Sequence, residues 1–372
     1  MMDSGRSTAK QSSQKPIKVL IVDDSAFMRY SISHNLAAHP ELQIIGTAHD
    51  GEEALGLIPK LKPDVVTLDV EMPHLDGLST LRRIMAEFPM PVIMLSSLTK
   101  EGAAETIQAL TLGAVDFVEK PSDRLNIQKV MDETAVKIIN AARARVNPLA
   151  IAPAQPSQAM QPSGDKKVRP RQKLEPIVVI GTSTGGPRAL YQVIPALPAD
   201  LEAACVVVQH MPAGFTHSLA ERLNTISKLA VKEAQPGDTL DTGQVLIAPG
   251  GFHMMLDDKS QITLNQNPPV HGVRPAIDVT LTSIVQKYGK SVISVILTGM
   301  GRDGTNGSVL LHSIGGWVIA EHESSCIVWG MPRSVVEANA ADAVYPLPEI
   351  APAIEKAVKA FKSSALSRAY GD

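Results

Sequence analysis

The chain has 372 residues, 44% of them hydrophobic and 20% charged, and this length predicts two or three globular domains. Lys and Arg number 35 against 38 Asp and Glu, so the net charge of −3 provides no bulk field that favours nucleic acid or an anionic membrane. Only Cys205 and Cys326 occur, which excludes a disulfide framework and a cysteine metal site.

The start of the chain is polar, without the apolar core of a secretory signal. No apolar run in the sequence is long enough to span a membrane. We therefore expect a cytoplasmic protein that binds no nucleic acid and inserts into no membrane.

Five short apolar runs alternate with helix-like segments in the first third of the chain. They begin at Ile17, Leu42, Val65, Pro91 and Ala114. This rhythm predicts a sheet of five parallel strands with crossover helices. Functional side chains in such sheets gather at the carboxyl ends of the strands. Those ends carry three carboxylates, a hydroxyl and an ammonium, which are Asp23, Asp24, Asp69, Ser96 and Lys120.

Carboxylates that converge in one pocket repel one another and suit a hard divalent cation such as Mg²⁺, which also binds phosphate. Each of these residues could instead be a helix cap or a surface charge. Five of them at successive strand ends favour a functional site.

The segment from Lys18 to Ala142 resembles a response-regulator receiver domain, which has a flavodoxin-like fold. The resemblance rests on the Asp23-Asp24 pair, on the Asp-x-x-Met-Pro-x-x-x-Gly pattern that begins at Asp69, and on Lys120 followed by proline. It implies that Asp69 accepts a phosphoryl group from a histidine kinase and that Lys120 contacts the phosphoryl oxygens. In-line phosphoryl transfer needs such an anionic oxygen nucleophile and nearby cations.

The same resemblance implies further roles at this strand edge. Ser96 and Phe117 would be the switch residues that respond when the acyl phosphate forms. The implied Mg²⁺ ligands are Asp23, Asp24, Asp69 and the backbone carbonyl of Glu71.

The periodic pattern stops after Ala142, and residues 143–174 are predicted to be a linker between a receiver domain of residues 17–142 and a second domain of residues 175–364. The linker is rich in Pro, Ala, Gln and Ser and has no periodic apolar face, which is typical of a semi-rigid, solvated segment. Its basic residues either increase solubility or contact an acidic partner. They are Lys166, Lys167, Arg169, Arg171 and Lys173.

The second half returns to strands and helices. Apolar runs begin at Ile177, Cys205, Gln244, Val292 and Trp317. Residues 252–264 alternate around a polar turn and predict an antiparallel hairpin. We expect a Rossmann-like α/β domain whose sheet is mostly parallel with an antiparallel addition.

The first of these runs leads into Gly181-Thr-Ser183-Thr184-Gly185, which fits the Gly-x-Ser-x-Gly pattern of a nucleophile elbow. In an elbow, a sharp turn from strand to helix lifts the serine hydroxyl out of the sheet, and small flanking residues permit the turn. The pattern alone is weak, because runs of Gly, Ser and Thr are also ordinary turns.

Two further strands in this half end in residues that complete a catalytic set. His210 ends the second strand, and Asp303 follows the Val292 strand within a glycine-rich loop. Parallel strands deliver these side chains to one sheet edge, where His210 can take the proton of Ser183 and Asp303 can orient the imidazole. Backbone N–H groups near the elbow, at Thr184, and near Met300 are the expected oxyanion donors. Each residue also has a structural interpretation, as a core histidine or a turn aspartate.

Chain order distinguishes this set of residues from one alternative fold, and residue identity distinguishes it from another. The order Ser183, His210, Asp303 differs from that of an α/β-hydrolase, in which the acid precedes the histidine. A dinucleotide-binding fingerprint requires glycine where Ser183 stands, and an acid rather than His210 after the second strand.

The chain from about Lys18 to Lys359, apart from the linker, resembles the CheB family of chemotaxis protein-glutamate methylesterases. The motifs that carry this resemblance are Gly-Thr-Ser-Thr-Gly-Gly around Ser183, Gln-His-Met-Pro around His210 and Gly-Met-Gly-Arg-Asp-Gly around Asp303. The resemblance implies that the protein hydrolyses glutamate methyl esters on methyl-accepting chemoreceptors and deamidates certain glutamines. The segment from His271 to Asp278 also resembles a stretch that lines the cleft in this family.

The resemblance further implies that a chemotaxis histidine kinase phosphorylates the chain. We expect a monomer with Mg²⁺ at the receiver domain and no cofactor in the catalytic domain. A receiver changes mainly one face when phosphorylated, so it can gate a neighbour only through that face. The unphosphorylated receiver is therefore expected to cover Ser183.

Two other functions remain open at this point. One is a phosphorylation-switched binding module without enzymatic activity, although the second half lacks a basic face and a helix-turn-helix ending. The other is a serine hydrolase for a different small ester, because only the resemblance indicates a glutamyl substrate.

Overall fold

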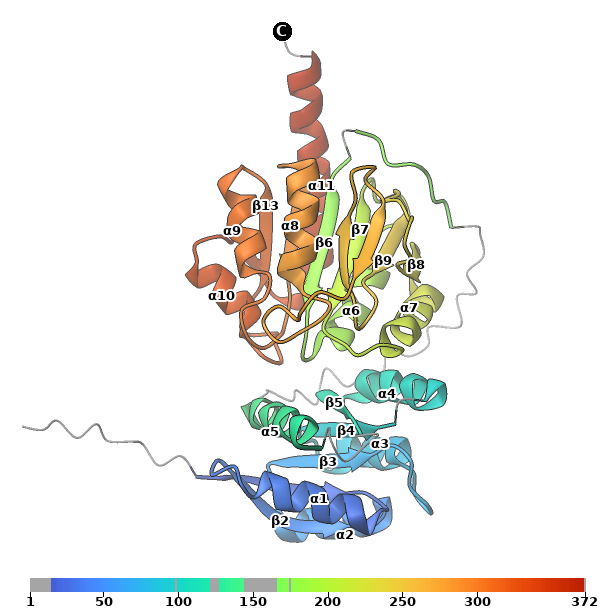
Figure 1. Ribbon diagram of the computed structural model, residues 1–372, viewed down its shortest axis with the longest axis vertical. Helices are drawn as coiled ribbons and strands as arrows, with labels where there is room; N and C mark the ends of the chain where they lie inside the picture. Colours follow the sequence, from blue (N-terminus) through green and yellow to red (C-terminus); the bar gives the residue numbers. More distant parts are fainter. Residues whose placement is uncertain (1–14, 98, 121–126, 144–165, 174, 371–372) are drawn as a thin grey trace, which may run out of the picture.

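Figure 1 shows the computed structural model of the chain, which describes residues 15–97, 99–120, 127–143, 166–173 and 175–370. The described residues form two separate parallel sheets, each packed between helices, and one small antiparallel pair of strands. No helix in this part of the chain is long and apolar enough to cross a membrane.

The first sheet has the five parallel strands that the sequence predicts, in the order β2-β1-β3-β4-β5. Its strands are β1 (Ile17–Val22), β2 (Leu42–Ala48), β3 (Val65–Asp69), β4 (Val92–Ser96) and β5 (Asp116–Glu119). Its helices are α1 (Ala26–Leu36), α2 (Gly51–Leu61), α3 (Gly77–Glu87), α4 (Lys100–Leu112) and α5 (Ile127–Arg143).

Local sequence explains where these helices begin. Ser25, Asp50, Asp76 and Thr99 each stand at the N-cap of one of the first four helices and accept a hydrogen bond from a backbone N–H of its first turn. The apolar runs of β3 and β4 are buried along their whole length, as expected for parallel strands covered on both faces.

The second sheet has seven strands, all parallel, in the order β14-β13-β12-β6-β7-β9-β8. They are β6 (Ile177–Thr182), β7 (Ala204–Gln209), β8 (Ala230–Glu233), β9 (Gln244–Ile247), β12 (Val292–Ile296), β13 (Trp317–Glu321) and β14 (Ala343–Tyr345). The helices are α6 (Gly186–Ala196), α7 (Phe215–Ile226), α8 (Ile277–Tyr288), α9 (Thr305–Ser313), α10 (Met331–Glu337) and α11 (Leu347–Tyr370).

Two details of this sheet differ from the sequence-based expectation. The hairpin forms as predicted, from β10 (His253–Leu256) and β11 (Ile262–Asn265), but it is a separate two-stranded sheet rather than an addition to the main one. The edge strands β8 and β14 were not predicted, because three or four residues are too few to show a periodic pattern.

Strand order places the functional residues. β6 lies between β7, which follows it in the chain, and β12, which comes more than a hundred residues later. Such a reversal of strand order opens a crevice at the carboxyl ends of the central strands, where doubly wound proteins bind their ligands.

The first sheet packs against the second near this same edge. Figure 1 shows α4, α5 and β5 on the side of the first domain that faces the second, where α4 contacts α6 and α7. At its centre the Phe117 and Phe215 rings lie 4.5 Å apart between centroids, and both side chains are buried. Burial of two aromatic rings stabilises this contact by excluding water from their faces.

Most of the predicted linker, residues 144–165, lies outside the described residues. Residues 166–173 are half-buried or exposed, and two of their arginines contact the second domain. Arg169 pairs with the buried Glu175 and exchanges backbone hydrogen bonds with Thr242, while Arg171 stacks on the Tyr288 ring. These arginines therefore fix the beginning of the second domain to its own sheet.

Candidate active site

Ser183 lies directly after β6, in the turn that leads into α6. Its N–H donates to the Thr298 carbonyl at 3.0 Å, and its carbonyl accepts from the Gly186 N–H at 2.8 Å. Gln209 Nε2 donates to the carbonyls of both Ser183 and His210, at 3.0 Å each, and so ties the ends of β6 and β7 together. The backbone of the serine is held on three sides, while its side chain stays partly exposed.

Glycines permit the sharp turn at this position. Gly185 has a φ of 77°, in the left-handed region that side chains disfavour, and a Cβ there would also meet Ile327. Across the crevice, a Cβ on Gly299 would come within 2.8 Å of Ser183 Cβ and 2.5 Å of Met331 Sδ. Two chain segments can therefore approach the serine closely only because both carry glycine.

His210 and Asp303 form a buried pair beside this turn. His210 Nε2 lies 2.8 Å from Asp303 Oδ2, and the side chains are 9% and 2% exposed. Asp303 also accepts hydrogen bonds from the backbone N–H groups of Ile277, Asp278 and Gly304. Burial alone would raise the pKa of Asp303, but the hydrogen bond and charge of His210 and these N–H donors hold it below its usual value.

The structure thus brings together the three predicted residues, from the ends of the neighbouring strands β12, β6 and β7. Because Nε2 of His210 faces Asp303, Nδ1 is the ring nitrogen left to accept a proton. No hydrogen bond joins Ser183 Oγ to His210 among the described residues. Catalytic hydrogen bonds are often long before substrate binds, so this geometry is compatible with a nucleophile and its base.

One predicted oxyanion donor, Thr184, follows Ser183 in the chain, and the other, Met300, follows Gly299, whose backbone lies close to Ser183. In the described part of the chain, the backbone N–H groups of Thr184 and Met300 have no hydrogen-bond acceptor. The Met300 side chain is 44% exposed, and its Sδ accepts from Asn140 of α5. Two free N–H groups beside a serine can hold the negative oxygen of a tetrahedral intermediate.

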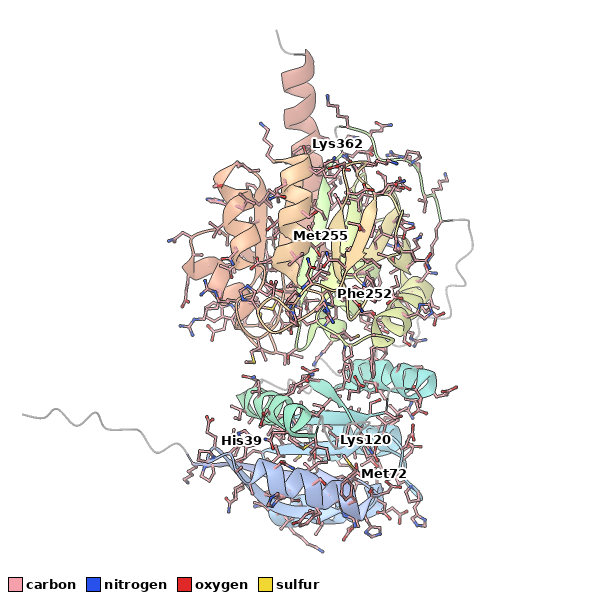
Figure 2. The ribbon with its side chains drawn as sticks, viewed as in Figure 1. His39, Met72, Lys120, Phe252, Met255 and Lys362 are labelled. Carbon is pink, nitrogen blue, oxygen red and sulfur yellow. The ribbon has the colours of Figure 1, made fainter. Side chains whose placement is uncertain are left out.

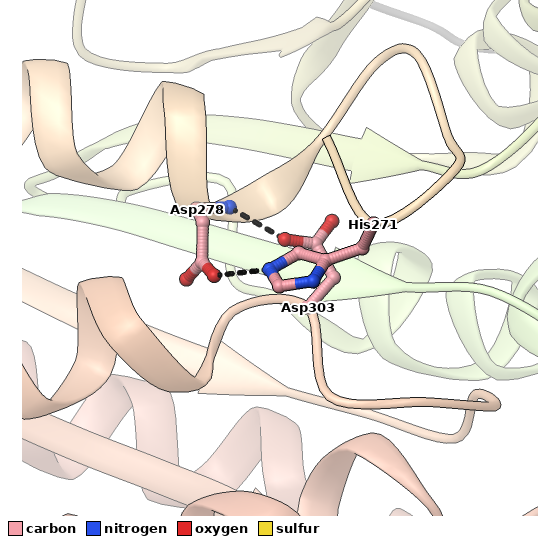
Figure 3. A group of neighbouring side chains, drawn as sticks. All are labelled: His271, Asp278 and Asp303. Carbon is pink, nitrogen blue, oxygen red and sulfur yellow. Dashed lines mark hydrogen bonds and ion pairs between the residues drawn. The ribbon is translucent and has the colours of Figure 1, made fainter. Parts of the chain in front are cut away.

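A second histidine and carboxylate, His271 and Asp278, lie beside Asp303, as Figure 3 shows. His271 Nε2 lies 3.0 Å from Asp278 Oδ2, and the backbone N–H of Asp278 donates to Asp303. Burial and the nearby charge of Asp303 raise the pKa of Asp278, although the Gly307 N–H opposes this by donating to its carboxylate. The sequence singled out this segment, but it did not predict a link to Asp303.

His271, Asp278 and Asp303 are close enough to hold a metal ion. The donor set fits one poorly, because both oxygens of Asp303 already accept two hydrogen bonds each, from three backbone N–H groups and from His210. A cation would have to displace one of these donors. The arrangement is better suited to fixing the orientation of Asp303.

The acidic cluster of the first sheet forms as predicted from the ends of β1 and β3. Lys120 Nζ lies 3.0 Å from Asp23 Oδ2 and 2.6 Å from Asp69 Oδ2, and Figure 2 labels Lys120 at this edge. Burial raises the pKa of Asp69 to about 6, although Lys120 opposes the shift. Asp24 is exposed at the rim, and the ligand oxygens of Asp23, Asp24 and Asp69 lie within 4.8 Å of one another.

These oxygens fit a hard cation, because three carboxylates converge with a single ammonium among the described residues around them. The N–H of Glu71 donates to Asp69 Oδ1, so the residue whose carbonyl is a predicted ligand lies beside the cluster. The adjoining cavity of about 500 Å³ is lined by Asp24, Glu71 and Glu105, among others.

The two predicted switch residues occupy different surroundings. Ser96 is buried, and its hydroxyl accepts from Thr106 of α4 at 2.6 Å. Phe117 is buried against Phe215 of the second sheet. The Ser96 carbonyl also accepts from the Lys120 N–H at 2.8 Å, so Ser96 lies between α4 and the lysine of the acidic cluster. Phe117 lies on the boundary between the sheets.

One residue that sequence patterns missed links the first sheet to the Ser183 turn. Asp116, which precedes Phe117, accepts a 2.6 Å hydrogen bond from the Thr184 hydroxyl. Lys137 of α5 lies 3.4 Å from Asp116 and also contacts Glu133. Burial alone would lower the pKa of Lys137, but the charges of Asp116 and Glu133 raise it above its usual value. An aspartate at the start of a strand carries no sequence signal for such a contact.

Comparisons with known proteins match both halves of the chain. Residues 19–132 match the family model of the response regulator receiver domain, and residues 178–354 match that of the CheB methylesterase. A protein-glutamate methylesterase/protein-glutamine glutaminase of Symbiobacterium thermophilum is 52% identical over 93% of this chain and 98% of its own length. The protein of the same name from Geobacillus kaustophilus is 49% identical over 91% of this chain and 98% of its own length.

Among solved structures, the catalytic domain of Thermotoga maritima CheB methylesterase is 48% identical. It covers 49% of this chain and 98% of its own length, with a TM-score of 0.48.

Proposed function

Because this chain belongs to the protein-glutamate methylesterase/protein-glutamine glutaminase family, with a receiver domain joined to a CheB methylesterase domain, we propose that it removes methyl groups from glutamate side chains of chemoreceptors. It also converts certain receptor glutamines to glutamate. Both reactions are acyl transfers to a serine, so one site serves both.

Ser183 is the nucleophile of this reaction and His210 is its general base. His210 Nδ1 takes the hydroxyl proton as Ser183 Oγ attacks the carbonyl carbon of the glutamyl group. The carbonyl oxygen becomes an oxyanion that the N–H groups of Thr184 and Met300 hold. Asp303 orients the imidazole and stabilises its positive charge through the contact with Nε2.

The intermediate then collapses. The bond to the leaving group breaks, the proton on Nδ1 passes to it, and methanol or ammonia departs while Ser183 keeps the glutamyl acyl group. A water molecule gives its proton to His210, attacks the ester and releases glutamate. Ser183 Oγ recovers the proton, so the enzyme returns to its first state.

Access to Ser183 is controlled by the receiver. Asp69 accepts a phosphoryl group from a histidine kinase, with Lys120 binding the phosphoryl oxygens. Asp23, Asp24, Asp69 and the Glu71 carbonyl would hold Mg²⁺, which neutralises charge during the transfer. Ser96 and Phe117 respond to the phosphoryl group, and the face that carries Phe117 leaves the second domain.

Contacts across the boundary support this regulation. The face formed by α4, β5 and α5 lies against the edge that carries Ser183, and it contacts the two residues proposed as oxyanion donors. A protein substrate needs far more room at a serine than the Thr184 to Asp116 contact leaves.

The observation that carries the proposal is the 2.8 Å contact of His210 with Asp303 beside the Ser183 turn. Covalent trapping tests it: full-length protein, incubated with a small phosphodonor and Mg²⁺, is mixed with receptor methylated at glutamate. We expect methanol release and an acyl adduct on Ser183, and neither with Ser183→Ala. Methanol release by Ser183→Ala at the wild-type rate contradicts the assignment.

The matched control is Ser294→Ala, which removes a buried hydroxyl from β12 without touching the site. It should release methanol like the wild type. A chain that releases no methanol but cleaves small esters in a Ser183-dependent way would be a hydrolase of another substrate.

A further inference from the structure

Thr298 is buried between the ends of β6 and β13. It forms three hydrogen bonds with the turn that carries Ser183, although no sequence motif singles it out. Its carbonyl accepts from the Ser183 N–H at 3.0 Å and from the Thr182 hydroxyl at 3.1 Å. Its hydroxyl donates to the Thr184 carbonyl at 3.0 Å and accepts from the Val328 N–H at 3.0 Å.

One residue therefore contacts all three residues of the nucleophile turn, from 182 to 184. Two of these contacts fall on the backbone groups that flank the 183–184 peptide, which are the Ser183 N–H and the Thr184 carbonyl. Because the N–H of Thr184 is a proposed oxyanion donor, the orientation of the 183–184 turn decides where that N–H points. Thr298 itself is 2% exposed, so it meets no substrate directly.

The other side of Thr298 is fixed by a buried carboxylate. Its N–H donates to Glu321 Oε2 at 2.8 Å, and Glu321, the last residue of β13, is 0% exposed. β13 ends here, so no further backbone carbonyl of the strand continues the ladder, and the side chain supplies the acceptor. Ser325 donates to the other carboxylate oxygen at 2.9 Å.

Glu321 is a buried titratable group that the proposed mechanism does not use. Burial raises its pKa, although the Thr298 N–H and the Ser325 hydroxyl oppose the shift. Retaining a carboxyl group at such a position costs stability unless its hydrogen bonds serve a purpose. The purpose that the contacts indicate is to hold the Thr298 peptide.

We infer that Thr298 is a positioning residue for the acyl transfer at Ser183, and that Glu321 anchors it. Thr298 keeps the nucleophile and the Thr184 N–H in the orientation that the transition state requires. The inference rests on the proposed function, because it assigns a role within the same reaction. A positioning error at a reacting centre lowers the turnover rate without changing how the distant parts of a substrate bind.

The test compares Thr298→Val with Thr298→Ser in the full-length protein, with phosphodonor and Mg²⁺ present. Valine has nearly the shape of threonine but makes neither hydroxyl contact, whereas serine makes both. We expect kcat for a small ester to fall about 10- to 100-fold in Thr298→Val, with KM changed less than about twofold, and to stay within about threefold in Thr298→Ser.

A second readout reports on the turn without turnover. The rate at which a fluorophosphonate labels Ser183 should fall in Thr298→Val as kcat does, because labelling also passes through an oxyanion. The matched control is Ser294→Ala, four residues before Thr298. It removes a buried hydroxyl that contacts the Ser308 hydroxyl. It should lower the melting temperature and leave kcat and labelling unchanged.

Glu321 is tested by Glu321→Gln against Glu321→Met. Glutamine keeps an oxygen that can accept from the Thr298 N–H, so kcat should stay within about threefold of wild type. Methionine removes the acceptor and should lower kcat about 10-fold or more. Equal kcat in the two variants excludes the anchoring role.

Failure of this inference can be distinguished from failure of the proposed function. If wild type and Ser183→Ala hydrolyse the ester equally, the proposed function fails. If hydrolysis depends on Ser183 but folded Thr298→Val has wild-type kcat and labelling rate, only the role of Thr298 is excluded. If Thr298→Val does not fold, the same measurements of kcat and labelling rate are made on Thr298→Ala. Alanine also lacks the hydroxyl and introduces no steric clash.

Discussion

The Thr184 hydroxyl donates a 2.6 Å hydrogen bond to Asp116 Oδ2, and this contact joins the residue after Ser183 to the first sheet. Thr184 therefore has two roles. Its N–H is a proposed oxyanion donor, and its side chain forms a hydrogen bond with the receiver domain. We expect the bond to contribute to closing the site.

Thr184→Val should therefore weaken the closed state. A hydrogen bond to a charged group contributes about 1.5–3 kcal/mol, so the ratio of unphosphorylated to phosphorylated activity should rise by about 10-fold to 100-fold. Taking the ratio in one preparation cancels any direct effect of the substitution on catalysis. Thr184→Ser, which keeps the hydroxyl, should leave the ratio unchanged, and an unchanged ratio in Thr184→Val assigns closure to other contacts.

Removal of the receiver should have a larger effect. A segment that begins at Lys166 retains the Arg169 contact with Glu175 and Thr242, which a start near Leu174 would lose. We expect it to hydrolyse ester faster than the unphosphorylated full chain. In the full chain, Asp69→Asn should abolish activation by a small phosphodonor. Equal rates for the segment and the full chain contradict gating.

Asp303→Asn tests the orientation of the base. Asparagine still accepts from the Asp278 and Gly304 N–H groups, but an NH2 in place of Oδ2 faces His210, favours the wrong tautomer and leaves the Ile277 N–H without its acceptor. We expect kcat to fall by about 10³ to 10⁴ in a protein that still folds with a lower melting temperature. Asp238→Asn, in an ion pair with Lys232 beside the edge strand β8, is the control and should keep wild-type kcat. Full activity in Asp303→Asn excludes it from the set.

Gly299→Ala should damage the site by steric conflict. The new Cβ would lie 2.8 Å from Ser183 Cβ and 2.5 Å from Met331 Sδ, closer than carbon and sulfur atoms approach without displacement. We expect labelling of Ser183 by a fluorophosphonate to become at least about 10-fold slower. The control is Gly56→Ala in α2, where a Cβ meets nothing within 4 Å and labelling should be normal.

Glu175 predicts a pH dependence of stability. Burial would raise its pKa, but Arg169, the Gln172 N–H and Thr242 lower it to about 2 from an ordinary 4.5. A carboxyl group with a lowered folded-state pKa contributes stability above pH 4.5 and loses it as the pH falls toward 2. Glu175→Gln should thus be destabilised by roughly 1–3 kcal/mol at pH 7, and the difference should shrink below pH 4.5.

The measurement of this effect can be confined to one domain. Both tryptophans of the chain, Trp317 and Trp329, lie in the second domain, so denaturation followed by their fluorescence reports on that domain alone. A difference between Glu175→Gln and wild type that is constant from pH 7 to pH 3 contradicts the role of the charge.

The sequence was sufficient to predict the functional residues that lie at the ends of strands. Asp69, Ser183 and His210 each follow an apolar run, and parallel strands carry such residues to one edge whatever the loops do. The position of Asp303 could not be predicted from a strand end alone, because it lies seven residues beyond β12. The glycine-rich loop around it indicated a functional site.

Contacts between distant segments could not be predicted in this way. Asp116 reaches Thr184 only through docking of one sheet on the other, and Glu321 reaches Thr298 only because β13 lies beside β12. Neither Asp116 nor Glu321 belongs to a sequence motif that indicates such a contact. Their roles depend on tertiary packing, which hydrophobic period and motif spacing do not encode.

The order of the strands in the second sheet has a consequence for synthesis of the chain. Ser183 and His210 belong to β6 and β7, whereas Asp303 follows β12, which enters the sheet on the other side of β6. A chain emerging from the ribosome therefore carries the proposed nucleophile and base well before the residue proposed to orient them. We expect the nascent protein to be inert until its last third has been made and inserted, and by then the first domain, which is proposed to cover the serine, is complete.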